Sequence, residues 1–183
     1  MFTSKGRNPD FSQLYIHLGQ HLNLDVRTLD KKQQRTLRKQ LSGLDLEGFD
    51  CVLLDLHFKN IYNQGLVLSK VPRLMIYEED ACQNYLGNSR WRGKFSRLYK
   101  RLPHARIVVT GASVAGRLRK EGFDASFAPK GYDPAMVYLQ PESQSLEQRD
   151  IELGFIGRTA SAAYAQRQAL LEQLAAIEPL QLM

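Results

Sequence analysis

The stretch ARIVVTGASVAGRLRKEGFDASFAPKGYD, from Ala105 to Asp133, predicts a strand, a helix and a second strand. Ile107 to Thr110 is a β-branched run, and Gly111 opens a turn into the helix. Gly122 then ends the helix before an extended pattern resumes at Ser126 to Ala128. Such βαβ units build parallel sheets, whose carboxyl ends meet at the edge where α/β proteins bind ligands. The stretch therefore predicts an α/β fold and directs the search for a site to the strand ends.

The rest of the chain continues this alternation of predicted strands and helices. The predicted strands are Leu24–Leu29, Asp50–Phe58, Arg73–Tyr77, Ile151–Ile156 and Leu180–Met183, and the predicted helices are 10–22, Lys31–Leu44, the segment Ser89–Arg101 and Ala162–Ile177. Asp50–Phe58 is the most apolar extended run, so we expect a central strand that is buried on both faces. No convincing strand precedes the first helix. Together these elements predict a Rossmann-like parallel sheet flanked by helices.

Length and composition limit the number of domains. The chain has 183 residues, of which 43% are hydrophobic, enough for one good core and part of a second. We expect a first domain over 1–140, a polar linker over 141–149, and the first βα of a second domain over 150–183. No run approaches the roughly 18 apolar residues of a membrane span, and no secretory signal is evident. A cytoplasmic protein is therefore expected.

The net charge of +6 is concentrated in one segment. SRWRGKFSRLYKR, from Ser89 to Arg101, contains six basic residues and no acidic residue. Helical spacing places its apolar side chains on one face and leaves a basic patch outside, formed by Arg90, Lys94, Arg97 and Arg101. This patch is either a solvated helix face or a surface that attracts a phosphorylated partner, a lipid head group or a nucleic acid.

Three motifs together resemble a known enzyme family. YEEDACQNY, then VVTGASVAGRLRKEGFDASFAPKGYDP, then RDIELGFIGRTASAAYAQRQALLEQL resemble the GT-B glycosyltransferases of the spore-maturation type, within the group 1 glycosyl transferases. The resemblance implies an acceptor-side domain that closes at the FAPKGYDP stretch and a donor-side domain that opens at DIELGFIG. It also implies a nucleotide sugar as co-substrate, with no further cofactor. The acceptor would be a glycan, a lipid-linked molecule or a protein, and contact with the inner face of a membrane is compatible with such an enzyme. The remainder of the donor-side domain would lie beyond Met183, so we expect this chain alone to be inactive.

Sugar transfer needs a group that accepts the acceptor's proton and positive charge or amide dipoles that hold the leaving diphosphate. The candidates for the first, catalytic role project from the ends of two predicted strands: Asp55, His57, Glu78, Glu79 and Asp80. For the second, donor-binding role, Gly157 precedes a helix whose amide groups could receive phosphate, with Arg158, Tyr164 and Arg167 nearby. A structural role is the alternative for each of them, such as loop capping by Asp55 or a turn at Lys130 and Asp133.

Other classes fit the sequence less well. There is no Asp-x-Asp motif of metal-dependent GT-A enzymes and no GxGxxG motif of nicotinamide enzymes. Cys51 and Cys82 lack the spacing of a metal site or a disulfide framework, so no metal is predicted. DCVLLDLHF resembles the phosphoacceptor strand of a response-regulator receiver, with Asp55, Thr110 and Lys130 in the site, but the LMIY strand intervenes before the threonine. A nucleic-acid-binding module built on the basic segment is a further, less favoured alternative.

Overall fold

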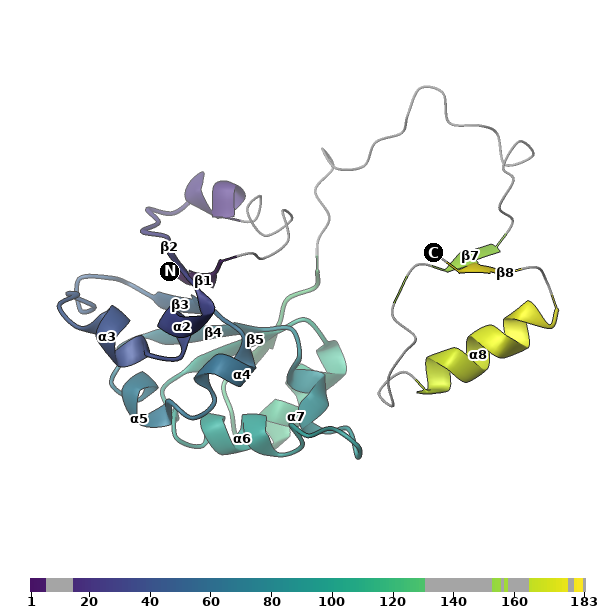
Figure 1. The fold of residues 1–183 in the computed structure, drawn as a ribbon. Coiled ribbons are helices and arrows are strands. Elements are labelled where there is room, and N and C mark those ends of the chain that lie inside the picture. Colours follow the sequence, from purple (N-terminus) through teal and green to yellow (C-terminus); the bar gives the residue numbers. More distant parts are fainter. Residues whose placement is uncertain (6–14, 131–152, 156, 158–164, 178–179, 183) are drawn as a thin grey trace, which may run out of the picture. The chain divides into compact units, whose positions relative to one another are not determined.

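A parallel sheet of six short strands organises the larger part of the chain. Its strands are β1 (Phe2–Ser4), β2 (Arg27–Leu29), β3 (Val52–Asp55), β4 (Leu74–Glu78), β5 (Arg106–Val109) and β6 (Ala125–Phe127). They lie in the order β2-β1-β3-β4-β5-β6, and every neighbouring pair runs parallel (Figure 1). The predicted α/β class with a Rossmann-like parallel sheet is confirmed.

The structure, a computed structural model, describes residues 1–5, 15–130, 153–155, 157, 165–177 and 180–182. The chain divides into two compact units, Met1–Pro134 and Ala135–Met183, and each has its own sheet. The predicted linker 141–149 lies outside the described residues, as does the first part of the predicted helix 10–22, of which residues 15–19 are helical.

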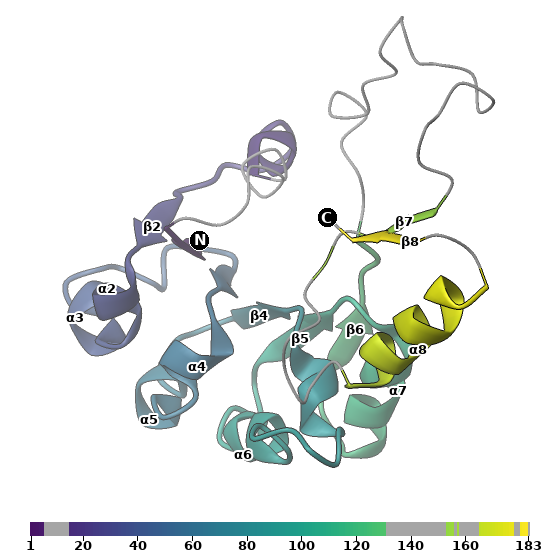
Figure 2. The same ribbon diagram turned by 45° about the vertical axis from the view of Figure 1, so that its right-hand side comes forward.

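The strand order explains where the helices of the larger unit lie. The chain moves from β1 to β2 in one direction and then returns past β1 to build β3, β4, β5 and β6. Right-handed crossovers place the connections made after this return on one face of the sheet. They are α2 (Lys31–Gln34), α3 (Leu37–Leu41), α4 (Phe58–Ile61), α5 (Gly65–Leu68), the 3-10 helix η1 (Ala81–Asn84), α6 (Lys94–Tyr99) and α7 (Ala112–Lys120). Figure 2 shows α4, α5, α6 and α7 on one side of the sheet, and the helical turn at 15–19 on the other.

The hydrophobic core lies between the sheet and this layer of helices. Along strand β4, side chains that face the core alternate with side chains that do not: Leu74 and Ile76 are 1% exposed, whereas Met75 and Tyr77 are half-buried. The helices contribute side chains with the spacing of an amphipathic helix, and α6 buries Phe95 and Leu98 as predicted. Together the fully buried positions include Leu54, Leu56, Ile61, Leu68, Leu102, Ile107, Ala115 and Leu118.

The segment predicted as one helix over Lys31–Leu44 is two helices, α2 and α3. Asp30 caps α2 through a capping box with Gln33. The helix breaks between α2 and α3 because the side chain of Gln64 supplies hydrogen bonds that a continuous helix would otherwise make. Its Nε2 donates to the carbonyl of Gln34 at 2.6 Å, and its Oε1 accepts from the amide of Leu37 at 2.9 Å.

Two predictions about strands were wrong. The central strand β3 is Val52–Asp55, shorter than the predicted Asp50–Phe58, because His57 is the N-cap of α4 and Phe58 begins that helix. It is also not buried on both faces, since Leu53 is only half-buried. In addition, a strand does precede the first helix. β1 pairs with β2 and with β3, so these two neighbours define a strand too short to stand out in the sequence.

The smaller unit contains a parallel pair of strands joined by a helix. β7 (Leu153–Phe155) pairs with β8 (Leu180–Leu182), and α8 (Ala165–Ala175) connects them. These elements follow the predicted order. The apolar spacing predicts a buried face formed by Ala169, Leu170, Leu174 and Ile177. This prediction was wrong, because Leu170 and Ile177 are 55% and 76% exposed, whereas Leu171 is 8% exposed. Because the described part of this unit offers the helix a sheet of two strands, the pattern of apolar residues did not define which side of the helix is covered.

Tyr85 connects the loop after β4 to the end of α7 by a hydrogen bond. Its raised pKa leads us to expect a loss of stability in alkali. Its hydroxyl donates to Oε1 of Glu121 at 2.7 Å. Burial, followed by this carboxylate, raises the pKa of Tyr85 from 10.0 to about 12. The unfolded chain therefore loses this proton first, and stability should fall as the pH rises from 10 to about 12.

Urea unfolding across this pH range measures the effect. We expect Tyr85→Phe, which cannot ionise, to show a shallower fall in stability than the parent chain. Equal slopes for the two proteins would contradict the assignment.

Candidate functional site

Asp55 lies at the carboxyl end of β3 and is held by two hydroxyl groups. Its side chain is 1% exposed, and Oδ2 accepts a hydrogen bond from Thr3 Oγ1 at 3.1 Å and another from the hydroxyl of Tyr15. The two hydroxyl oxygens are themselves 2.6 Å apart. The sheet register sets Thr3 directly beside Asp55, and Tyr15 comes from the helical turn that follows β1. Sequence reasoning missed both partners, because neither lies near Asp55 in the chain.

The next strand delivers a second group of acidic side chains to the same edge. Glu78 ends β4, is 5% exposed, and accepts a hydrogen bond from the amide of Asp80 at 2.8 Å. The side chain of Glu79 is 21% exposed, and Asp80 is exposed at the start of η1. His57, two residues after Asp55, is also exposed. The strand ends thus bring the predicted candidates to one edge of the sheet.

The two buried acids at this edge do not form a carboxylate pair. The register sets Leu54 beside Ile76, so Asp55 and Glu78, which are one and two positions further along their strands, project from opposite faces. Asp55 meets Thr3 and Tyr15, whereas Glu78 lies on the side of α6. There burial, followed by the charge of Glu78, raises the pKa of Tyr99 well above its ordinary value. Chemistry that needs two neighbouring carboxylates is therefore not supported by this pair.

Lys130 forms an ion pair across the carboxyl edge of the sheet, between the ends of β4 and β6. Its Nζ lies 3.0 Å from Oε1 of Glu79. Glu79 follows β4 and Lys130 follows β6, and β5 lies between these strands. The ion pair therefore spans the carboxyl end of β5, where Gly111 caps the start of α7. Asp133, the other residue considered in this turn, lies outside the described residues.

The predicted donor-binding residues belong to the smaller unit. Gly157 follows β7, and a Cβ at this position would lie 2.7 Å from the ring of Phe155, so the close approach favours glycine. The guanidinium of Arg167, on α8, lies 5.8 Å from the centroid of the same ring. Arg158 and Tyr164 lie outside the described residues.

The predicted basic patch is distributed along α6 and the loop before it. The guanidinium of Arg90 lies 4.9 Å from the ring centroid of Trp91, and Nζ of Lys94 lies 5.0 Å from the same centroid. Arg97 is exposed, and the side chain of Arg101 packs where a Cβ on Gly65 would lie. The four cations form a strip along the surface rather than a converging site.

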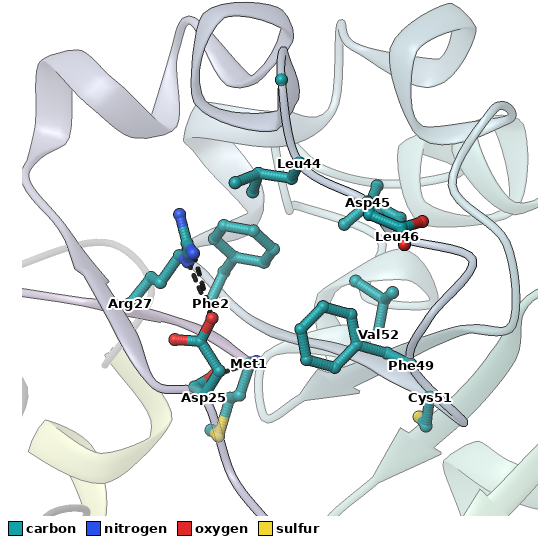
Figure 3. Close-up of a pocket in the computed structure, with 11 residues that line it drawn as sticks. Met1, Phe2, Asp25, Arg27, Leu44, Asp45, Leu46, Phe49, Cys51 and Val52 are labelled. Atoms are coloured by element: carbon teal, nitrogen blue, oxygen red, sulfur yellow. Dashed lines mark hydrogen bonds and ion pairs between the residues drawn. The ribbon is translucent and has the colours of Figure 1, made fainter.

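Two cavities lie at the opposite edge of the sheet. One of about 270 Å³ is lined by the amino ends of β1 and β3, with Phe2, Phe49 and Val52 around it and an ion pair between Arg27 and Asp25 (Figure 3). Another of about 250 Å³ lies nearby and is polar. Neither cavity includes the acids at the strand ends. Because α/β sheets bind ligands at the carboxyl edge, we assign the candidate site there and not to these cavities.

The geometry does not favour a response-regulator receiver. β4 lies between β3, which ends at Asp55, and β5, which Thr110 follows, and Lys130 pairs with Glu79. In addition, the carboxylate of Asp55 is buried beneath two hydroxyl groups, where a phosphodonor would have to displace them.

The chain is thus defined as an α/β protein with a doubly wound parallel sheet and a separate βαβ unit. Comparison with protein-family models, with curated proteins and with solved structures gives no significant match. Among the described residues, no helix is both long and apolar enough to cross a membrane. The same residues include no group of three His, Cys, Asp or Glu side chains placed to hold a metal ion.

Proposed function

We propose that the chain belongs to a glycosyltransferase of the GT-B type, which transfers a sugar from a nucleotide donor to an acceptor. The observation that carries this proposal is the tandem arrangement of two parallel α/β units. The first has six strands and a ligand edge rich in acids, and the second opens with a strand, a glycine turn and a helix. Two such units in succession are what an enzyme with separate acceptor and donor domains requires.

In this proposal the larger unit binds the acceptor at its carboxyl edge. His57 and Asp80 are the exposed members of the candidate set, so they can touch an acceptor hydroxyl. His57 accepts the proton as the acceptor oxygen bonds to the sugar's anomeric carbon and the bond to the diphosphate breaks. Asp55 is a positioning residue, because its carboxylate is occupied by Thr3 and Tyr15.

The smaller unit binds the donor. The turn at Gly157 and the cation of Arg167 supply amide dipoles and positive charge for the diphosphate that leaves. The proposal includes a cytoplasmic location for the protein.

Chemical-shift mapping of the labelled chain tests the acceptor site. The probes are methyl glucosides and N-acetylglucosamine as acceptors, and UDP-glucose and GDP-mannose as donors. We expect the acceptor sugars to shift resonances of His57, Glu79 and Asp80. Because one lost hydrogen bond to a bound sugar weakens affinity by about tenfold, His57→Ala and Asp80→Ala should each weaken binding by about that factor.

Glu47→Ala and Asp50→Ala are the matched controls, since both residues are exposed and Asp50 lines the cavity at the opposite edge. These variants should bind the sugars as the parent chain does. Shifts confined to the cavity around Phe2 and Phe49, or no shift with any sugar, would count against the proposed acceptor site.

A further inference from the structure

A strip of six cations on the larger unit lies apart from the candidate site. We call Arg90, Arg92, Lys94, Arg97, Lys100 and Arg101 the cationic strip. Among the described residues, none of the six forms an ion pair, although four other cations do so with nearby carboxylates. Five of the six are exposed and Lys94 is half-buried. An uncompensated strip of this length creates a positive field over one part of the surface.

The fold of α6 directs these charges outward together. Phe95, Leu98 and Tyr99 are buried against the core. Helical spacing then leaves Lys94, Arg97, Lys100 and Arg101 on the outer arc of the helix. At the far end, the stem of Arg101 lies against Gly65, so α5 continues the same surface.

Two exposed leucines accompany the strip, one in the loop that leads to Arg90 and one next to Gly65, against which Arg101 packs. Leu86 precedes Arg90 in the loop and is 49% exposed, and Leu66 follows Gly65 on α5 and is 80% exposed. Cations flanked by exposed apolar side chains are typical of surfaces that rest on a lipid bilayer, where the charges meet head groups and the apolar groups enter the interface.

The surroundings of Trp91, which lies between Arg90 and Arg92 in the chain, do not favour single-stranded nucleic acid as the partner. Arg90 and Lys94 lie over the ring of Trp91, and Phe58 and Tyr62 meet that ring in edge-to-face contacts. Single-stranded nucleic acids bind by stacking bases on open aromatic faces. A ring covered in this way instead fixes the two cations at the surface.

We propose that the cationic strip, with Leu66 and Leu86, docks the chain on membranes that carry anionic head groups. The cations contact lipid phosphates, and the two leucines enter the boundary between head groups and acyl chains. This surface lies on α5, α6 and the preceding loop, so the inference does not depend on the proposed sugar transfer.

Flotation with lipid vesicles tests the proposal on the full chain. We expect binding to phosphatidylcholine vesicles that contain about 30% phosphatidylglycerol, and little binding to phosphatidylcholine alone. The strip variant replaces Arg90, Arg92, Arg97 and Lys100 with glutamine. Because each cation near an anionic surface contributes about a fivefold change in partitioning, the variant should bind several hundredfold more weakly.

A second quadruple variant is the matched control. It replaces Lys31, Lys32, Arg38 and Lys39 with glutamine, which removes the same charge from exposed positions on α2 and α3. It should retain binding close to that of the parent chain. An equal loss in both variants would show that only net charge matters and would overturn the proposal, as would failure of the parent chain to bind anionic vesicles.

Two further measurements separate the lipid partner from other polyanions. Leu66→Ser combined with Leu86→Ser should weaken vesicle binding at high salt, where screening removes most of the electrostatic attraction. Binding of the parent chain to a DNA duplex but not to anionic vesicles would overturn the proposal in favour of a nucleic acid. Unchanged urea unfolding of each variant shows that the comparison concerns folded protein.

Discussion

Replacing Phe95 with alanine should lower the free energy of unfolding of the larger unit by about 3–5 kcal/mol. Phe95 is 1% exposed, and its ring stacks on Phe58 with centroids 3.6 Å apart. It also meets Tyr99 edge-on at 6.3 Å, so one side chain joins α4 to α6. Truncation removes these contacts and leaves a cavity that the surrounding helices can fill only in part. Since a domain is stable by about 5–15 kcal/mol, the loss would be a large fraction of the total.

Urea unfolding followed by circular dichroism measures this loss. Leu66→Ala is the matched control, because Leu66 is 80% exposed and its truncation should change stability by less than about 0.5 kcal/mol. A similar small change for Phe95→Ala would show that the aromatic stack between α4 and α6 is not part of a packed core.

Replacing Asp55 with alanine is expected to lower the free energy of unfolding by about 1–3 kcal/mol. The substitution leaves the buried hydroxyl of Thr3 and the half-buried hydroxyl of Tyr15 without this acceptor. It also separates the turn at residues 15–19 from the end of β3. Asp80→Ala is the control, because this exposed acid lies at the same edge and should contribute little to stability.

A double-mutant cycle isolates the contact itself. Tyr15→Phe removes one donor, so it should cost less in the Asp55→Ala background than in the parent chain, and the effects should be non-additive by at least about 0.5 kcal/mol. Additive effects would show that Tyr15 and Asp55 act independently. A gain in stability for Asp55→Ala would mean that burial of this acid costs more free energy than its hydrogen bonds contribute. That result would indicate that Asp55 serves activity and not stability.

Local patterns were sufficient to predict much of the fold. The stretch from β5 to β6 has a β-branched run, a helix with apolar residues four apart, and Gly122, whose φ of +90° ends the helix. Where elements depend on distant partners, the sequence was insufficient. β1 is defined by its pairing with β2 and β3, and the break between α2 and α3 depends on Gln64, which lies many residues later.

The same distinction applies to the candidate site. Strand ends predicted which edge Asp55, His57 and Asp80 occupy, since parallel strands deliver their carboxyl ends together. The faces from which Asp55 and Glu78 project depend on the register between β3 and β4, which a single sequence does not contain. Lys130 was considered a turn residue, and only the order β4-β5-β6 shows why its side chain can reach Glu79.

The sheet order has a consequence for handling the protein at high concentration. The outermost strands are β2 and β6, and each is only three residues long. Outer strands expose backbone amides and carbonyls that can recruit the strands of other molecules, and short ones offer little length for such recruitment. The larger unit should therefore resist growth into extended sheets, even though its inner strands are rich in the residues that favour fibrils.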